Sequence, residues 1–114
     1  MGLAAVPRSL DLLQGTLDLL VLRTLAWGPM HGYTVARLIK ERSGKMFLVE
    51  EGALYPALHR LERKGWVASE WGVSENKRKA KYYQLTSAGR AAMRSELAEW
   101  DRYTKAVQGV LQPA

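Results

Sequence analysis

The sequence predicts a mostly α-helical protein with one small β-hairpin and a long final helix. Two observations predict this fold class. Leucines and other apolar residues recur at intervals of three and four through residues 10–61 and again through 93–111, which is the spacing of helices that bury one face. Between these stretches, residues 66–85 hold two short segments rich in aromatic residues around a polar turn, the pattern of a hairpin.

The composition is that of a soluble domain and excludes several classes of protein. The chain has 114 residues, 47% hydrophobic and 25% charged, enough for one domain with a modest core. No stretch approaches the roughly 20 apolar residues that span a membrane, and Asp11 and Asp18 interrupt the leucines that a secretory signal would need. With no cysteine there are no disulfides or thiolate metal sites. We expect a cytoplasmic protein.

The net charge of +6 is concentrated in one part of the chain. Residues 59–86 contain seven basic and three acidic residues and so carry four of the six net positive charges, whereas residues 87–114 are nearly balanced. A local excess of lysine and arginine is typical of proteins with a polyanionic partner.

The first third of the chain predicts two helices. The first begins after the possible N-cap Ser9, is firmest over 16–27, and ends at the turn signal that starts at Gly28; residues 1–8 are expected to fray. The second covers Gly32 to Arg42, after which Gly44 ends it.

The third helix contains a proline. In GALYPALHRLERKGW, residues 52–66, leucines recur at i, i+4 and i+7, yet a proline inside a helix costs about 3 kcal/mol. We therefore expect the helix to begin near Gly52 or Ala53, which would put Pro56 in the first turn, where a missing N–H group costs little.

The outward face of this third helix predicts a nucleic-acid contact. With the leucines facing inward, it carries little side-chain bulk at its start and hydrogen-bond donors further along. Small residues at a helix N-terminus allow close approach to a groove floor, and the helix dipole favours phosphate there. We expect base contacts from Ala53, Pro56, His59 and Arg60, and phosphate contacts from Tyr55 and Arg63.

After Gly65 the apolar period changes to two. The segments WVASEW (66–71) and AKYYQL (80–85) are expected to pair as a hairpin with Tyr83 and Leu85 in the core. The tip of this hairpin is basic, with Lys77, Arg78, Lys79 and Lys81 in or next to its turn. A charge run is usually a solvated face, but its place beside the third helix favours contacts with DNA phosphates.

The order helix, helix, helix, hairpin, helix is that of a winged helix-turn-helix. We expect residues 1–86 to form this DNA-binding domain and residues 87–114 a C-terminal dimerisation helix that starts at the N-cap Thr86. In helix-turn-helix proteins the second helix of the pair enters the major groove of DNA by its N-terminal residues. The third predicted helix is therefore the expected recognition helix.

The final helix has a heptad seam on one side. Its members are Met93, Leu97, Trp100, Thr104, Val107 and Leu111. A helix of roughly 25 residues is about 37 Å long, too long for so small a domain to cover. Folding back on its own domain is the alternative. We favour a homodimer, in which this helix and the first helix pack against a twofold mate.

Three segments of the sequence resemble the PadR family of bacterial transcriptional regulators. They are GPMHGYTVARLI, GALYPALHRLERKGW and KYYQLTSAGR, within a match over about Leu13 to Arg90. The short tail with one terminal helix is similar to the small subfamily. The resemblance implies a winged-helix homodimer that represses transcription at a palindromic operator and is often released by small aromatic or drug-like compounds.

The resemblance also bears on three residues. Tyr33, in the HGY motif, is interpreted as either a packing residue or a phosphate contact. Ala53 stands where the family usually carries Ser or Thr, so a hydroxyl is missing, although its methyl group suits a thymine methyl. In some drug-responsive members two indoles near the dimer axis hold a flat ligand, which makes Trp100 the predicted effector contact; a core or interface role is the alternative.

Catalysis and metal binding have little support. Gly44-Lys45 lacks the rest of a P-loop, and His31 and His59 belong to no HExxH or carboxylate grouping. We expect no enzyme activity, cofactor or metal, and interpret His31 as a hydrogen-bond partner at a helix start. The competing hypothesis is a protein-interaction module that uses the same fold without DNA. Such a module would typically expose an apolar patch, whereas the basic hairpin with outward Arg60 and Arg63 favours double-stranded DNA.

Overall fold

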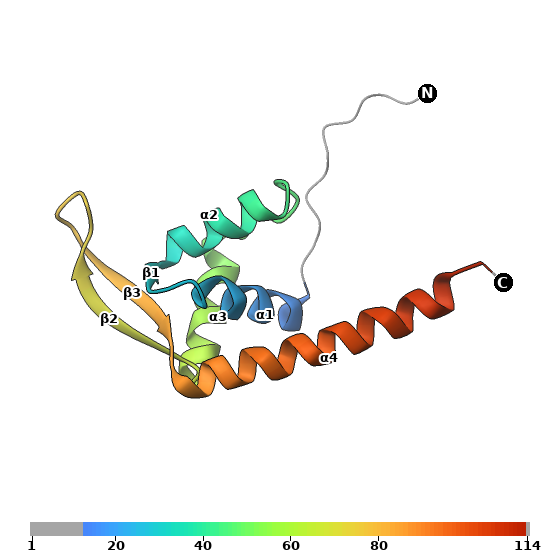
Figure 1. Ribbon diagram of the computed structural model, residues 1–114. Helices are drawn as coiled ribbons and strands as arrows, with labels where there is room; N and C mark the ends of the chain where they lie inside the picture. The colour runs from blue at the N-terminus through green and yellow to red at the C-terminus, as the bar shows by residue number, and fades with distance from the viewer. Residues whose placement is uncertain (1–12, 114) are drawn as a thin grey trace, which may run out of the picture.

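The computed structural model describes residues 13–113, which form four α-helices and a three-stranded antiparallel sheet (Figure 1). In chain order these are α1 (Gln14–Leu25), β1 (Met30–His31), α2 (Gly32–Arg42), α3 (Glu51–Arg63), β2 (Val67–Val73), β3 (Lys79–Leu85) and α4 (Ser87–Leu111). The predicted fraying of residues 1–8 and the predicted N-cap Ser9 lie outside the described residues. The predicted fold class, a winged helix-turn-helix followed by a long helix, is confirmed.

Helix ends agree best with the sequence where a cap or a glycine marks them. The bounds of α2 are those predicted, and α3 stops before Gly65, whose φ of 77° is in the left-handed region that glycine adopts easily. Thr86 is the N-cap of α4, as predicted, and its side chain accepts a hydrogen bond from the Gly89 N–H. The first helix ends at Leu25, two residues before the predicted limit.

The sheet has the order β1-β3-β2. Strands β2 and β3 form the hairpin in register from Val67 opposite Leu85 to Val73 opposite Lys79. The short strand β1 was not predicted. It pairs Met30 with Tyr83, and a strand of two residues is too short to show alternation in the sequence.

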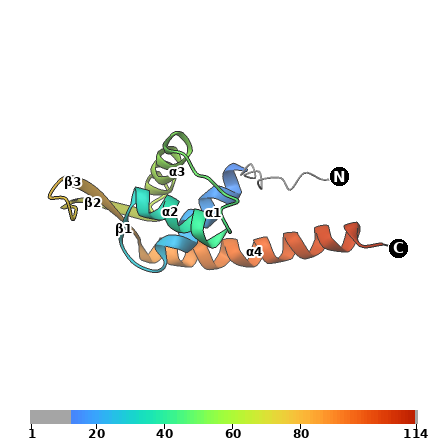
Figure 2. The same cartoon turned by 90° about the horizontal axis from the view of Figure 1, so that it is seen from above.

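The core lies among α1, α2 and α3 and is closed by one face of the hairpin. Tyr83 and Leu85 are buried in it, as predicted, while Tyr82 is on the other side of the strand. Figure 2 shows the three helices grouped beside the hairpin, with α4 running past them. The largest fully buried side chains are those of Leu22, Leu25, Leu54, Leu58, Leu61, Val21 and Val35.

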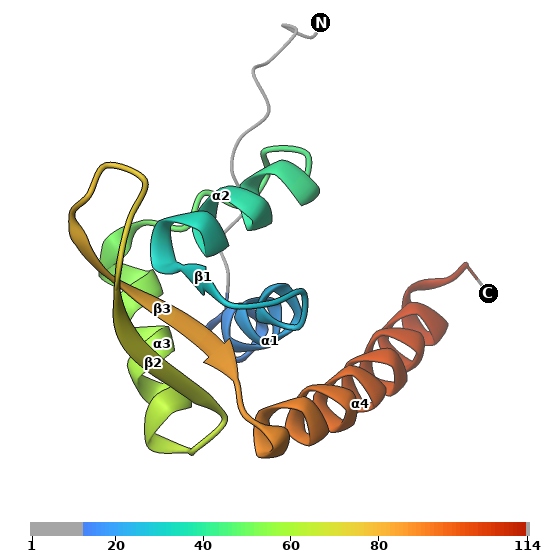
Figure 3. The same cartoon turned by 60° about the vertical axis from the view of Figure 1, so that its left-hand side comes forward.

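The helix α4 extends well beyond the domain that precedes it (Figure 3). Its first half packs against α1 and β3, with Met93 against the core. The overall extents of 55 × 36 × 21 Å reflect this projection. Large apolar side chains on α4 remain exposed, namely Trp100, Tyr103, Val107, Val110 and Leu111.

The junction between α3, the hairpin and α4 is held at Gly89. The Thr86 hydroxyl donates to the Gly65 carbonyl at 2.7 Å, and the Thr86 N–H donates to the Trp66 carbonyl at 3.0 Å. Gly89 is buried in the first turn of α4, and a Cβ placed on it would overlap the Trp66 carbonyl oxygen. Because that oxygen belongs to the backbone, it cannot move aside as a flexible side chain would.

Gly89→Ala is therefore expected to lower the free energy of unfolding by about 1–3 kcal/mol, the usual cost of overpacking. The matched control is Gly109→Ala, also in α4, where a Cβ meets no atom within 4 Å. Alanine is favoured over glycine in a helix by roughly 0.5–1 kcal/mol, so this variant should be as stable as the wild type or more so. Urea unfolding followed by circular dichroism gives both values. Equal midpoints for the two variants would contradict the clash at Gly89.

Candidate nucleic-acid interface

Helix α3 presents the predicted outward face to solvent. Leu54, Ala57, Leu58 and Leu61 are buried on its inner side. Its exposed residues are Glu51, Gly52, Ala53, Pro56, His59 and Arg63, while Tyr55 and Arg60 are half-buried. The small residues at the start of the helix leave its backbone open to a partner, as the sequence indicated.

The position of Pro56 in the helix differs from the prediction. Helix α3 begins at Glu51, with Glu50 as N-cap and the Ala53 and Leu54 N–H groups donating to the Glu50 carbonyl. Pro56 is thus the sixth helical residue, one or two positions deeper than predicted and beyond the first turn. Its missing N–H removes the bond that the Gly52 carbonyl would otherwise accept. Because Gly52 and Pro56 are both exposed, that carbonyl remains open to solvent.

The outward orientation predicted for Arg60 is wrong. Its guanidinium donates to both carboxylate oxygens of Asp18 on α1, from Nη2 to Oδ1 at 2.8 Å and from Nε to Oδ2 at 3.3 Å. The two side chains retain 22% and 13% of their exposure. Hydrogen bonding to Asp18 raises the pKa of Arg60; desolvation opposes this rise, and the negative charge of Asp18 adds a smaller upward effect. The partner is 42 residues away, so helical spacing within α3 could not reveal it.

The hairpin forms an ordered basic wing. Ser74 organises the turn, because its N–H donates to the Arg78 carbonyl at 2.8 Å and its hydroxyl accepts from the Arg78 N–H at 3.2 Å. Lys77 adopts a left-handed φ of 58°. Lys77, Arg78 and Lys79 are exposed, and Lys81, half-buried, holds its Nζ 5.4 Å from the centre of the Trp71 ring. The predicted basic tip therefore has exposed cationic side chains at the turn, whereas Lys81, further along β3, packs against Trp71.

His31 joins the sheet to the start of α2, but not by capping the helix. It occupies the N-cap position without a side-chain cap bond, and its Nδ1 lies 3.1 Å from the Lys81 carbonyl of β3. Its ring also packs 3.9 Å from that of Tyr82 and 5.3 Å from that of Tyr33. His31 is thus a hydrogen-bond partner at a helix start, as interpreted, but its bond runs across the sheet to β3 instead of capping α2.

Tyr33 packs against its neighbour and is also exposed, so its role as a phosphate contact stays a prediction. It stacks on His31 with an interplanar angle of 11°, yet 59% of its surface is exposed. It lies where α2 and the wing meet, because it lines a pocket together with Arg37 of α2 and Tyr82 of β3.

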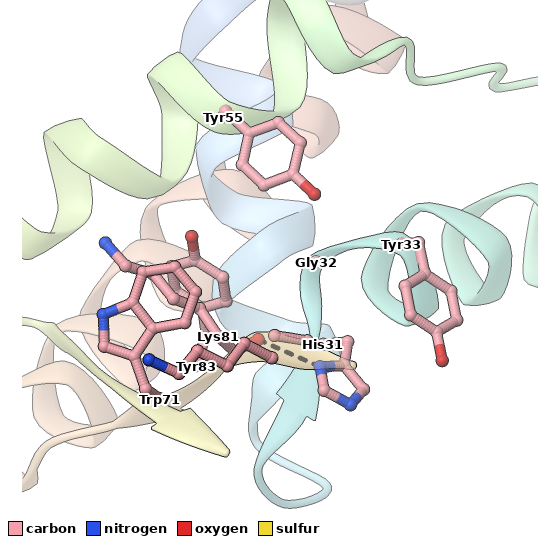
Figure 4. Close-up of a pocket in the computed structure, with 9 residues that line it drawn as sticks. His31, Gly32, Tyr33, Tyr55, Trp71, Lys81 and Tyr83 are labelled. Atoms are coloured by element: carbon pink, nitrogen blue, oxygen red, sulfur yellow. Dashed lines mark hydrogen bonds between the residues drawn. The ribbon is translucent and has the colours of Figure 1, made fainter. Parts of the chain in front are cut away.

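A cavity of about 310 Å³ lies between α3, the start of α2 and the wing (Figure 4). Tyr55 reaches into it from α3, Trp71 from β2, and Lys81 and Tyr83 from β3. The Tyr55 ring passes so close to Gly32 that a Cβ there would be 3.0 Å from the ring. A side chain at Gly32 would therefore crowd the Tyr55 ring, a constraint that the sequence alone did not show.

Trp100 lies in a separate groove between α1 and α4. The groove has a volume of about 390 Å³, and Trp100 is 41% exposed in it. Its neighbours are Leu13, Gly15, Thr16, Leu19, Glu96, Glu99 and Tyr103. The Tyr103 ring stacks against the indole with centroids 6.1 Å apart. One wall is therefore aromatic and the other is formed by α1, with two carboxylates nearby.

Two further properties of residues 13–113 bear on function. In this part of the chain the helices are all too short or too polar to cross a membrane. The same residues contain no group of three or more histidine, cysteine or acidic side chains placed to hold a metal ion.

A helix-turn-helix pair with an exposed second helix, flanked by a basic hairpin, defines a winged helix-turn-helix protein. Residues 21–95 match the model of the transcriptional regulator PadR-like family, and this chain belongs to that family. It is a transcriptional regulator and not an enzyme, and the family implies binding to DNA.

Relatives and solved structures agree with this assignment. The chain is 36% identical to the transcriptional regulator Rv3488 of Mycobacterium tuberculosis over 89 residues, 78% of this chain and 79% of the relative. A PadR family regulator from Eggerthella lenta aligns with a TM-score of 0.76 at 33% identity, covering 89% of this chain and 86% of the other. For a transcriptional regulator from Clostridium thermocellum the TM-score is 0.79 at 27% identity, with 87% and 96% covered.

Proposed function

We propose that this protein binds a palindromic operator as a homodimer and represses transcription. The observation that carries the proposal is the exposed, small-residue start of α3 beside a wing whose tip is basic and unburied. A major groove admits a helix whose N-terminal residues are small, and cationic side chains beside it neutralise phosphates.

The contacts divide into two kinds. Ala53, Pro56 and His59 lie on the exposed face of α3 and reach base edges. Phosphates are held by exposed or half-exposed donors around them: Tyr33, Tyr55, Arg63, Lys77, Arg78, Lys79 and Lys81. Arg60 is left out of both groups, because its donors are already directed at Asp18.

The homodimer rests on the exposed seam of α4. Apolar side chains at the distal end of this helix, such as Val107 and Leu111, contact little of their own domain and remain 38% and 75% exposed. A twofold partner would cover them with its own α1 and α4, making residues 87–114 the dimerisation helix. Two recognition helices related by that axis read the two halves of a palindrome.

The experiment is a selection of duplexes from a random pool by the full chain. The expected result is one enriched palindromic motif with half-sites about one helical turn apart, or a multiple of that spacing. A reporter gene behind the selected site then distinguishes repression from activation. Failure to enrich any motif at moderate salt would overturn the proposal and favour the protein-interaction hypothesis.

We further propose that a planar aromatic compound binds beside Trp100 and releases the DNA. The groove between α1 and α4 has the size of a small-ligand site, and its indole and phenol offer flat apolar surfaces. Because α1 and α4 are also the proposed dimer elements, a ligand there would act on the spacing of the two recognition helices.

Trp100→Leu is expected to lose most of the tryptophan fluorescence quenching that planar aromatic compounds cause in the wild type. Leucine keeps the groove apolar but removes the ring on which a flat ligand stacks. Trp27, Trp66 and Trp71 contribute equally to both proteins, so the difference between the two titrations is the measurement. A saturated ring compound of similar size serves as the control ligand. Equal quenching in both proteins would exclude an effector site at Trp100 and leave the DNA-binding proposal unaffected.

A further inference from the structure

The Asp18–Arg60 pair is a directional contact between α1 and the helix that faces DNA. Arg60 binds the carboxylate with two donors, at 2.8 and 3.3 Å. A fork of this kind constrains angle as well as distance. The other ion pairs among residues 13–113 are exposed and local, each joining residues three or four positions apart in one helix.

The remaining contacts of α3 with the core are mostly apolar, and the Ser69 hydroxyl of β2 donates one further hydrogen bond to the Glu62 carboxylate of α3 at 2.8 Å. Leu54, Ala57, Leu58 and Leu61 fill the space beneath the helix. Apolar burial is strong but has no preferred direction, so it resists separation of two helices more than a small rotation or slide of one along the other. A two-point ionic contact opposes both movements.

Stability alone does not account for this pair. Burying two charges carries a desolvation cost that often cancels their attraction, and the best-attested role of such pairs is to fix register. Asp18 lies between Leu17 and Leu19, both buried, and Arg60 lies one position from His59 on the exposed face of α3. A change at Asp18 therefore acts on the DNA-facing helix without touching DNA.

We propose that Asp18 is a positioning residue for DNA recognition, which acts through Arg60 to hold α3 in the orientation that reads bases. This inference rests on the proposed DNA-binding function. It also ties α3 to α1, the helix whose Thr16 and Leu19 line the groove beside Trp100. The orientation of the reading helix thus depends on the helix that we assign to the dimer interface.

The test compares Asp18→Asn with Glu41→Gln. Each variant removes one negative charge and one arginine partner, but the Arg37–Glu41 pair is exposed and lies within α2, with both side chains more than half exposed. A general electrostatic gain in DNA affinity will therefore be the same in both. The probes are the duplex selected from a random pool by the wild type and a scrambled duplex of equal length.

The expected result is a fall of about tenfold in the ratio of selected to scrambled affinity for Asp18→Asn, the effect of one misplaced base contact. The ratio for Glu41→Gln should stay within about twofold of the wild type, the size of a surface ion-pair effect. Arg60→Lys, which keeps the charge and loses the fork, is the second variant and keeps the test available if Asp18→Asn unfolds. The double variant with both Asp18→Asn and Arg60→Lys should lose little more of this affinity ratio than either single variant, because both substitutions break the same contact.

Three outcomes are distinguishable. If the wild type selects no motif, the proposed function fails before the inference is tested. If the wild type is selective and a folded Asp18→Asn or Arg60→Lys keeps its ratio, the inference is overturned. Retained selectivity in Asp18→Asn together with lost selectivity in Arg60→Lys would overturn it in a specific way, because Arg60 would then read a base directly. Circular dichroism of each variant establishes that it is folded.

Discussion

Replacing Lys77, Arg78 and Lys79 by alanine is expected to weaken binding to operator and random DNA alike, by about a hundredfold near 0.15 M salt. All three side chains are exposed around the wing turn. The slope of log K against log salt should become shallower by about 0.9 for every phosphate that the variant no longer neutralises. The sequence preference should change little, because phosphate contacts carry no direct sequence information. Binding titrations at several salt concentrations measure both quantities.

The matched control removes three positive charges from another surface. Arg94, Arg102 and Lys105 are exposed on α4, outside the heptad seam. Their replacement by alanine lowers the net charge by the same amount and should leave most of the salt slope intact. A wing variant with an unchanged slope would remove the wing from the DNA interface. Equal reductions in the two variants would indicate a long-range effect of net charge instead of contacts at the wing.

Ending the chain after Arg90 is expected to abolish the homodimer. The deletion removes every seam residue from Met93 to Leu111 and uncovers the face of α1 against which α4 packs. The product should be a monomer or an aggregate, and its operator affinity should fall steeply because two half-sites are no longer bound together. Light scattering over a range of concentrations measures the state of assembly. A truncated chain that remains a soluble, folded dimer would contradict the assignment of α4.

A pair of point variants separates loss of the partner from loss of folding. Val107 belongs to the seam and Ala106 does not, and neither is buried in the single chain. Glutamate at either position therefore costs the isolated fold little. Only in a dimer does Val107→Glu bury a charge, so this variant should dissociate while Ala106→Glu should not. If both variants dimerise as the wild type does, the interface lies elsewhere.

Much of the fold could be predicted because its signals are local. Caps, glycines and a change of apolar period lie within a few residues of the elements that they delimit, as at Thr86 for α4 and Gly65 for α3. The exposed face of α3 was predicted for the same reason, since three buried leucines determine which side of a helix faces solvent. The basic tip was predicted because Lys77, Arg78 and Lys79 follow one another in the polar turn between the two strands.

The candidate site was predicted less completely because part of it depends on contacts between distant segments. Arg60 shares its helical flank with Ala53, and nothing within α3 distinguishes an arginine that faces DNA from one that binds Asp18. The same limit applies to His31, whose hydrogen-bond partner is the Lys81 carbonyl. It also applies to Gly32, where the nearby ring of Tyr55 leaves little room for a side chain. Each of these pairs joins residues that lie far apart in the chain.

The order of the elements, the buried face of each helix and the position of the positive charge can all be read from the sequence, because periodicity, capping and composition act over a few residues. Which polar groups remain free for a partner depends instead on the packing of the whole fold. A side chain such as that of Arg60 binds whichever acceptor the fold brings within reach, and that acceptor, Asp18, lies on a helix whose placement results from packing of the whole core.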